Sequence, residues 1–208
     1  MNGVKPVTVQ IFARAPVLGK VKTRLGPALS DEAILTLHKK LVRHCVRQVS
    51  NAGVGPMQLW VDQLPAHPFL KKLTSEYRGL TIHVQQGLDL GQRMATAIAS
   101  VDSLPVILIG SDCPSIDADY LNLATAALEK SDVVLGPAAD GGYVLIGSRS
   151  DTPPVFDDIE WGSAQVLRQT QAALDQAGWS LSTLPQRSDI DRPEDLAEAR
   201  RFGLLDNG

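Results

Sequence analysis

The sequence predicts an α/β fold in which a mostly parallel sheet lies between two layers of helices. Short apolar runs such as residues 106–110, which follow Pro105 and end in Gly110, are typical of strands buried on both faces of a parallel sheet. These runs alternate along the chain with segments of helical periodicity. That alternation indicates a three-layer α/β/α sandwich with a Rossmann-like sheet.

Each expected element has its own local signal. The first strand, Val7 to Ala13, leads into a long loop rich in Pro, Gly, Lys and Arg that runs to Pro27. From Ser30 the apolar residues recur at helical spacing, which predicts a helix with Ser30 as its N-cap and an end near residues 51–53. The remaining segments are strands at 57–61, 80–85, 106–109, 133–136, 143–148 and 179–184, and helices at 68–77, 90–101, 116–130, 162–178 and 193–202.

Composition sets the class of protein. The 208 residues, with 44% hydrophobic and 21% charged content, suit a single domain over residues 1–208. A net charge of -3 argues against a nucleic-acid partner, because phosphate backbones require a basic face. The chain has no apolar stretch long enough for a membrane span, and Cys45 and Cys113 show no metal-ligand spacing. We therefore expect a cytoplasmic protein.

The loop after the first strand carries an unusual concentration of positive charge. Four of the chain's 20 Lys and Arg residues fall within residues 14–24, namely Arg14, Lys20, Lys22 and Arg24. Such side chains bind phosphate, and backbone at the strand end and at a glycine can approach phosphate oxygens, so we add Ala13 and Gly19 to the expected ligand site. The loop is not a Walker A motif, because Val21 stands where Ser or Thr is required. The alternative is an ordinary solvated loop.

Three acidic loops follow expected strands and suggest a divalent metal, Mg²⁺ or Mn²⁺. Asp112 is the first candidate ligand, with Asp191 or Asp140 as its partner. Each has a structural alternative. Asp112 is a candidate N-cap of the helix that follows it. Asp191 is a candidate N-cap of the last helix, because Arg192 is a poor N-cap residue. Asp140, Gly141 and Gly142 have the pattern of a hairpin turn, which also predicts backbone presented to a ligand.

Candidate acid–base groups are few. Glu160, beside Trp161, is a candidate general base, and Asp140 is the other. The four histidines show no ligand or triad spacing, and the chain has no Gly-x-Ser-x-Gly motif. The sequence therefore does not predict a hydrolase with a serine nucleophile.

Four motifs in order, at residues 12–25, 110–114, 140–143 and 189–196, resemble the DUF2064 family of bacterial glycosyltransferases. That family is placed in the nucleotide-diphospho-sugar transferase superfamily, with the GT-A fold. The resemblance implies that Arg14, Lys20, Lys22 and Arg24 contact phosphates and that Asp112 holds a metal. Arg192 stands where the family usually has Thr, so we expect no capping box with Asp195.

The resemblance implies a transferase that uses a nucleotide-activated donor. The favoured function is glycosyl transfer from a nucleotide sugar to a small-molecule acceptor that Asp140 or Glu160 activates. The alternative is nucleotidyl transfer, in which a nucleoside monophosphate passes from a nucleoside triphosphate to an acceptor phosphate, as in guanylyltransferases. A third hypothesis is a nucleotide-binding module without catalysis.

Overall fold

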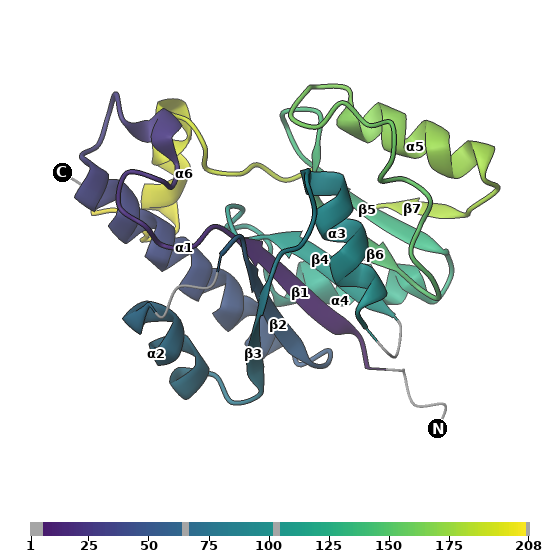
Figure 1. Cartoon of the computed structure of the whole chain (residues 1–208), viewed down its shortest axis with the longest axis horizontal. Coiled ribbons are helices and arrows are strands. Elements are labelled where there is room, and N and C mark those ends of the chain that lie inside the picture. The colour runs from purple at the N-terminus through teal and green to yellow at the C-terminus, as the bar shows by residue number, and fades with distance from the viewer. Residues whose placement is uncertain (1–5, 64–66, 102–104, 207–208) are drawn as a thin grey trace.

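The computed structural model describes residues 6–63, 67–101 and 105–206, and its strands form one seven-stranded sheet (Figure 1). The strand order is β3-β2-β1-β4-β6-β5-β7, and only β6 runs antiparallel to its neighbours, β4 and β5. The strands are β1 Thr8–Ala13, β2 Met57–Val61, β3 Leu80–Val84, β4 Val106–Gly110, β5 Val133–Pro137, β6 Tyr143–Ser148 and β7 Leu181–Thr183. The expected mostly parallel sheet is confirmed.

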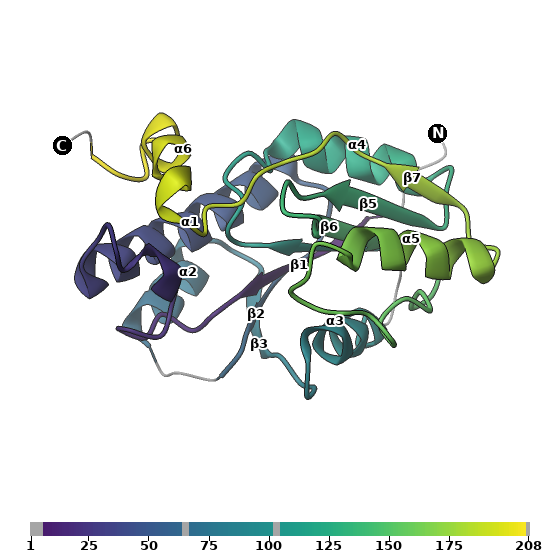
Figure 2. The ribbon, with the colours of Figure 1, turned by 90° about the horizontal axis from the view of Figure 1, so that it is seen from above.

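Helices cover both faces of this sheet, as the α/β/α prediction requires (Figure 2). Helices α1, α2 and α4 contribute to the core cluster on one face, and α3 and α5 to the cluster on the other. A third cluster joins α6 to the N-terminal half of α1. The helices are α1 Asp31–Ala52, α2 Pro68–Glu76, α3 Leu90–Ala99, α4 Ala118–Leu128, α5 Val166–Gln176 and α6 Leu196–Arg201, with 3₁₀ turns at η1 Thr23–Leu25 and η2 Pro193–Asp195.

Local signals explain where the helices begin and end. The Ser30 hydroxyl accepts the Ala33 amide at 3.3 Å, and Gly53 ends α1 with a φ of 61°, both as expected. Helix α5 begins at Val166 rather than at 162, because Gly162 adopts a φ of 85° that a helix cannot continue. The expected strand at 179–184 is only three residues long.

The structure contradicts the alternative role of Asp112 as a helix N-cap and the prediction that Asp195 forms no capping interaction. Asp112 does not cap α4. Asp117 does, through a 2.8 Å hydrogen bond from the Tyr120 amide. The Asp195 carboxylate accepts a hydrogen bond from the Arg192 amide at 2.7 Å, which is one of the two hydrogen bonds of a capping box. The other bond is absent, because the Arg192 side chain has no acceptor. The last helix is also split, into η2 and α6.

The parallel strands bring their carboxyl ends to one edge of the sheet. Strands β1 and β4 lie side by side there, although 96 residues separate their carboxyl ends, Ala13 and Gly110. The chain runs from β1 outward to β2 and β3 and returns to β4 on the other side of β1. Ligands of open α/β sheets bind at such a reversal of strand order. None of the helices in residues 6–63, 67–101 and 105–206 has both the length and the hydropathy to cross a membrane.

Candidate functional site

A cavity of about 770 Å³ opens at the carboxyl edge of β1 and β4. Residues that follow four neighbouring strands line it: Arg14 after β1, Asp62 after β2, Gln85 after β3 and Asp112 after β4. Their convergence follows from the parallel sheet, which collects these strand ends at one edge. The cavity is therefore the candidate ligand site.

The loop after β1 is packed against the protein and is not an ordinary solvated loop. Val21 is 2% exposed and Leu25 is fully buried, and both belong to the cluster that joins α1 to α6. Between them, Lys22 has a left-handed φ of 43° and a side chain that is 3% exposed. Buried apolar side chains on either side of Lys22 thus fix the path of the loop and the place of its ammonium group.

The structure divides the residues expected to bind a ligand into two groups. Those that line the cavity are Ala13, Arg14, Lys22 and Arg24. Those outside its lining are Gly19, Lys20, Gly141 and Gly142. Gly141 has a structural requirement instead, because its φ is 91° and a Cβ there would lie 2.4 Å from the Ala164 carbonyl oxygen.

Asp112 and Lys22, which both line the cavity, form an ion pair. The Lys22 Nζ lies 3.0 Å from Asp112 Oδ2 and also donates a hydrogen bond to the Ile190 carbonyl. The Ile190 amide donates to the Asp112 carbonyl at 2.9 Å, and the Ser111 hydroxyl donates to Asp112 Oδ1 at 3.3 Å. The loops after β1, β4 and β7 are therefore joined by the contacts of Lys22 and by the backbone hydrogen bond between Ile190 and Asp112.

Asp191, the second expected metal ligand, also lines the cavity and also carries a cation. Its Oδ2 accepts a hydrogen bond from Arg24 at 2.7 Å, in a pair that is more exposed than that of Asp112. Asp191 does not cap the last helix: Arg192 is at the N-cap position, and the Asp191 carboxylate accepts from Arg24 instead. Both expected metal ligands thus face the cavity, and both are paired with basic residues of the β1 loop.

The sequence did not single out several residues of the cavity. Asp62 accepts the Ala15 amide at 2.7 Å, and Gln85 donates to the carbonyls of Ala13 and Trp60. Arg93, near the start of α3, adds a fourth cation. Asp62 and Gln85 directly follow β2 and β3, so their positions in the sequence predict the same edge of the sheet as that of Asp112.

His38 on α1 was assigned no role from sequence. Its ring Nε2 lies 2.9 Å from the Arg14 carbonyl, so this nitrogen carries the proton and donates. The residue is 2% exposed, lines the cavity, and its Nδ1 has no partner among the described residues. Burial lowers the pKa of His38, which favours the neutral ring.

The two candidate general bases do not line this cavity. Asp140 is exposed and accepts the Gly142 amide at 3.0 Å, which is the hairpin-turn geometry of the alternative interpretation. Glu160 is exposed on the segment before α5. Asp140 nevertheless contributes to the electrostatics of this edge, since burial and the neighbouring carboxylates Asp140, Asp112 and Asp191 raise the pKa of Asp189.

The donor set suits a metal only together with a ligand. Among the residues that the structure describes, no group of three or more His, Cys, Asp and Glu side chains is placed to hold a metal ion. Mg²⁺ usually takes one or two protein carboxylates and completes its shell with water and substrate phosphates. Asp112 and Asp191, both on the cavity, meet that smaller requirement.

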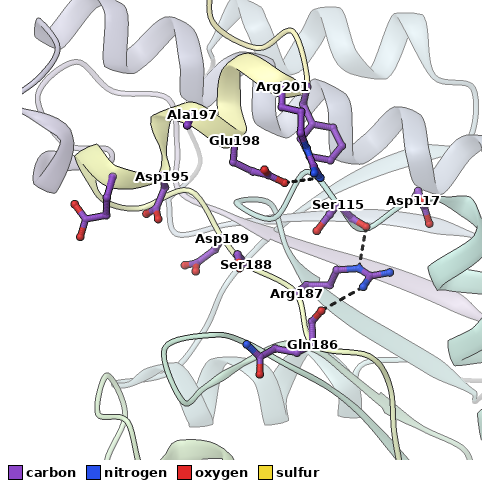
Figure 3. A pocket seen from close by; sticks show the side chains of 12 residues that line it. Ser115, Asp117, Gln186, Arg187, Ser188, Asp189, Asp195, Ala197, Glu198 and Arg201 are labelled. Carbon is purple, nitrogen blue, oxygen red and sulfur yellow. Dashed lines mark hydrogen bonds and ion pairs between the residues drawn. The ribbon is translucent and has the colours of Figure 1, made fainter.

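A second cavity, of about 630 Å³, is lined by residues 186–189 and by residues of α6 (Figure 3). There Arg187 donates to the Ser115 carbonyl at 3.3 Å, and its guanidinium lies 4.4 Å from the centre of the Tyr120 ring. The Tyr120 hydroxyl donates to the Pro185 carbonyl at 2.8 Å. Arg187 and Tyr120 thus anchor the segment that carries Asp189 and Asp191 to the loop that carries Asp112.

Comparison with known proteins places the chain in a family. The family model described as an uncharacterized protein conserved in bacteria, DUF2064, matches residues 45–163, which is more than half of the chain. The chain belongs to this DUF2064 family. The resemblance seen in the sequence motifs is therefore confirmed.

Curated relatives of this DUF2064 member are guanylyltransferases. The chain is 28% identical over 191 residues to a 3-phospho-D-glycerate guanylyltransferase from Phenylobacterium zucineum (strain HLK1), covering 86% of this chain and 84% of the relative. It is 24% identical over 192 residues to a 2-phospho-L-lactate guanylyltransferase from Methanopyrus kandleri (strain AV19), covering 89% and 87%.

A solved structure from Desulfovibrio desulfuricans G20 has the same fold as this DUF2064 chain. That protein, described as a candidate nucleotide-diphospho-sugar transferase, has a TM-score of 0.82 and 28% identity, covering 95% of this chain and 96% of its own. The nucleotide-diphospho-sugar transferase fold is confirmed, as is the expectation of an enzyme that is either a glycosyltransferase or a nucleotidyltransferase. The curated relatives favour the nucleotidyl alternative over the glycosyl function expected first.

Proposed function

We propose that the protein is a nucleotidyltransferase that moves a nucleoside monophosphate from a nucleoside triphosphate to the phosphate group of a small acceptor. The observation that carries this proposal is the charge of the cavity. Four cations line it, Arg14, Lys22, Arg24 and Arg93. Arginine and lysine grouped in this way suit a ligand with several phosphates.

The carboxylates that line the cavity already have hydrogen-bond or ion-pair partners, and this favours nucleotidyl transfer, which needs no general base, over glycosyl transfer. Each carboxylate that lines the cavity in the described part of the chain already accepts a hydrogen bond or forms an ion pair. An acceptor phosphate is ionised at neutral pH and needs no base. A hydroxyl acceptor does need one, and neither Asp140 nor Glu160 lines the cavity.

In the proposed reaction, an acceptor phosphate oxygen attacks the α-phosphorus of the triphosphate. The bond from the α-phosphorus to the α,β-bridging oxygen breaks, and pyrophosphate leaves with the electron pair. Lys22, Arg24 and Arg14 bind the phosphates and stabilise the charge on the leaving group. Asp112, with Asp191, would hold Mg²⁺ or Mn²⁺, which when bound neutralises charge on the phosphate oxygens.

The relatives suggest the substrate class. Their names specify a guanylyl group and two acceptors, 3-phospho-D-glycerate and 2-phospho-L-lactate. Both acceptors are small molecules that carry one phosphate and one carboxylate. We therefore assign GTP as the donor and a small phosphorylated carboxylate as the acceptor.

Product analysis tests this function directly. The protein is incubated with Mg²⁺, GTP and either 3-phosphoglycerate or 2-phospholactate, and pyrophosphate is measured. Parallel reactions use GDP-sugars with the same acceptors and with free sugars, and GDP is measured. Pyrophosphate release that depends on acceptor supports the proposal, whereas GDP release from a sugar nucleotide would establish glycosyl transfer instead.

Matched lysine variants connect the activity to the cavity. Lys22→Met should lower pyrophosphate release by about 100-fold or more, since it removes a charge that stabilises the leaving group. Lys71→Met, at an exposed lysine on α2 away from the cavity, should retain full activity. Equal activity of the two variants would contradict the assignment of this cavity.

A further inference from the structure

The two candidate metal ligands each lie against a cation from the same short stretch of chain. Lys22 is paired with Asp112 at 3.0 Å and Arg24 with Asp191 at 2.7 Å. The loop proposed to bind phosphates and the carboxylates proposed to bind metal therefore neutralise each other in the free protein. A ligand that binds both sets of residues competes with these pairs.

Lys22 is the more buried of the two cations. The Lys22 side chain is 3% exposed, whereas that of Arg24 is 66% exposed and its pair is correspondingly screened by solvent. The Lys22 ammonium has three donors, and Asp112 Oδ2 and the Ile190 carbonyl accept from it. The third donor has no acceptor among the described residues, and Lys22 lines the cavity.

The charge of the cavity opposes a metal ion that arrives alone. Four cations and three carboxylates line it, which gives a formal charge of +1. A divalent cation at Asp112 would also lie close to the Lys22 ammonium, which already occupies Oδ2. A triphosphate reverses this balance, since its negative charges attract the lysine and the metal together.

We propose that Lys22 occupies Asp112 in the free protein as a stand-in for a divalent cation, so that metal binds only together with the triphosphate. Lys22 exchanges the carboxylate for a phosphate oxygen as the nucleotide enters, and Asp112 then becomes available to the metal. This inference rests on the proposed function, because it takes the cavity to bind a triphosphate. It adds an order of binding, enforced by one buried side chain.

Binding of Mn²⁺ alone, followed by electron paramagnetic resonance without nucleotide, tests the proposal without any activity measurement. Wild-type protein should show no Mn²⁺ binding that depends on Asp112. Lys22→Met should bind Mn²⁺ at least about tenfold more tightly than wild type, because a close like charge is removed. The double variant Lys22→Met with Asp112→Asn should lose that gain.

Two further variants separate the proposal from general effects. Lys20→Met removes the same charge from the same loop, but Lys20 is exposed and does not line the cavity, so the Mn²⁺ affinity should stay at the wild-type level. Lys22→Gln keeps a donor for the Ile190 carbonyl and should give the same gain as Lys22→Met even if the methionine variant folds poorly. Wild-type Mn²⁺ affinity equal to that of both Lys22 variants overturns the proposal.

Triphosphate binding in EDTA distinguishes this inference from the function on which it depends. The wild-type protein should bind α,β-methylene GTP without metal, because Lys22 and the arginines supply the positive charge. Failure to bind it with or without Mn²⁺ contradicts the proposed function. Binding of α,β-methylene GTP, together with Asp112-dependent binding of Mn²⁺ alone to the wild type, leaves the function standing and overturns the order of binding.

Discussion

The substitution Asp112→Asn tests the central ion pair through stability, independently of activity. It keeps the size and shape of the side chain and removes the charge that faces Lys22 Nζ at 3.0 Å. The ammonium then remains buried, with the Ile190 carbonyl as its acceptor. A buried charge that loses its partner is costly, so the variant should be less stable than wild type.

The magnitude follows from the burial of the two partners. Removing one partner of a fully buried pair costs about 3–5 kcal/mol, and exposed pairs are worth about 0–1 kcal/mol. Lys22 is 3% exposed but Asp112 is 41% exposed, which places this pair between the two classes. We expect a loss of about 2 kcal/mol, or about 4–8 °C in Tm for a domain of this size.

A double-mutant cycle isolates the pair from its surroundings. Asp112 also raises the pKa of Asp189, so its neutralisation relieves some repulsion and partly offsets the loss. That relief is present whether or not Lys22 is replaced. Chemical denaturation of wild type, Asp112→Asn, Lys22→Met and the double variant should therefore give a coupling of about 1–2 kcal/mol. Coupling below about 0.3 kcal/mol would refute the reasoning, because the two residues would then act independently.

Further predictions concern the pairs and turns around this centre. Asp191→Asn, at the more exposed pair, should change stability by no more than about 0.5 kcal/mol in the same denaturation experiment. Gly141→Ala should cost more than about 1 kcal/mol, because φ is 91° and the new Cβ meets the Ala164 carbonyl; an unchanged melting curve would contradict this. Arg187→Met should speed hydrogen exchange of the Ile190 amide by about tenfold or more, while a surface amide on α2 keeps its rate. Burial lowers the pKa of His44 from 6.5, so the unfolded chain binds more protons and the stability of the protein should fall as pH drops below about 6.5. His44→Gln should flatten that part of the curve of stability against pH. An equal slope in the variant and the wild type would contradict this role of His44.

Much of the fold was predictable because the start and end of a helix depend on residues that are close together in the sequence. Ser30 and Gly53 bound α1 as expected, since a cap depends on the few residues beside it. Helix α5 was predicted too early because the sequence pattern did not reveal that Gly162 turns with a positive φ. The Asp195 interaction with the Arg192 amide was missed because it uses the backbone of residue 192, which any residue supplies.

The sequence predicted several residues of the cavity, but it did not predict the ion pairs between them. Asp112 and Asp191 were found because both follow strands, and strand ends converge in a parallel sheet. The partners Lys22 and Arg24 were expected to face phosphate, and only the three-dimensional structure places them on those carboxylates. His38 was overlooked because a histidine on the buried face of a helix has the same local pattern as a core residue.

The bond from Lys22 to the Ile190 carbonyl also has a consequence for how the protein folds. It joins residues 168 positions apart, and the hydrogen bond from the Ile190 amide to the Asp112 carbonyl joins residues 78 positions apart. Contacts of such long range form late, because the intervening chain must first be ordered. During synthesis, the strands and helices before residue 180 can form while the cavity still lacks one wall. The binding site should therefore mature after the sheet, and a nascent chain that ends before Ile190 should be folded in part but unable to retain the nucleotide.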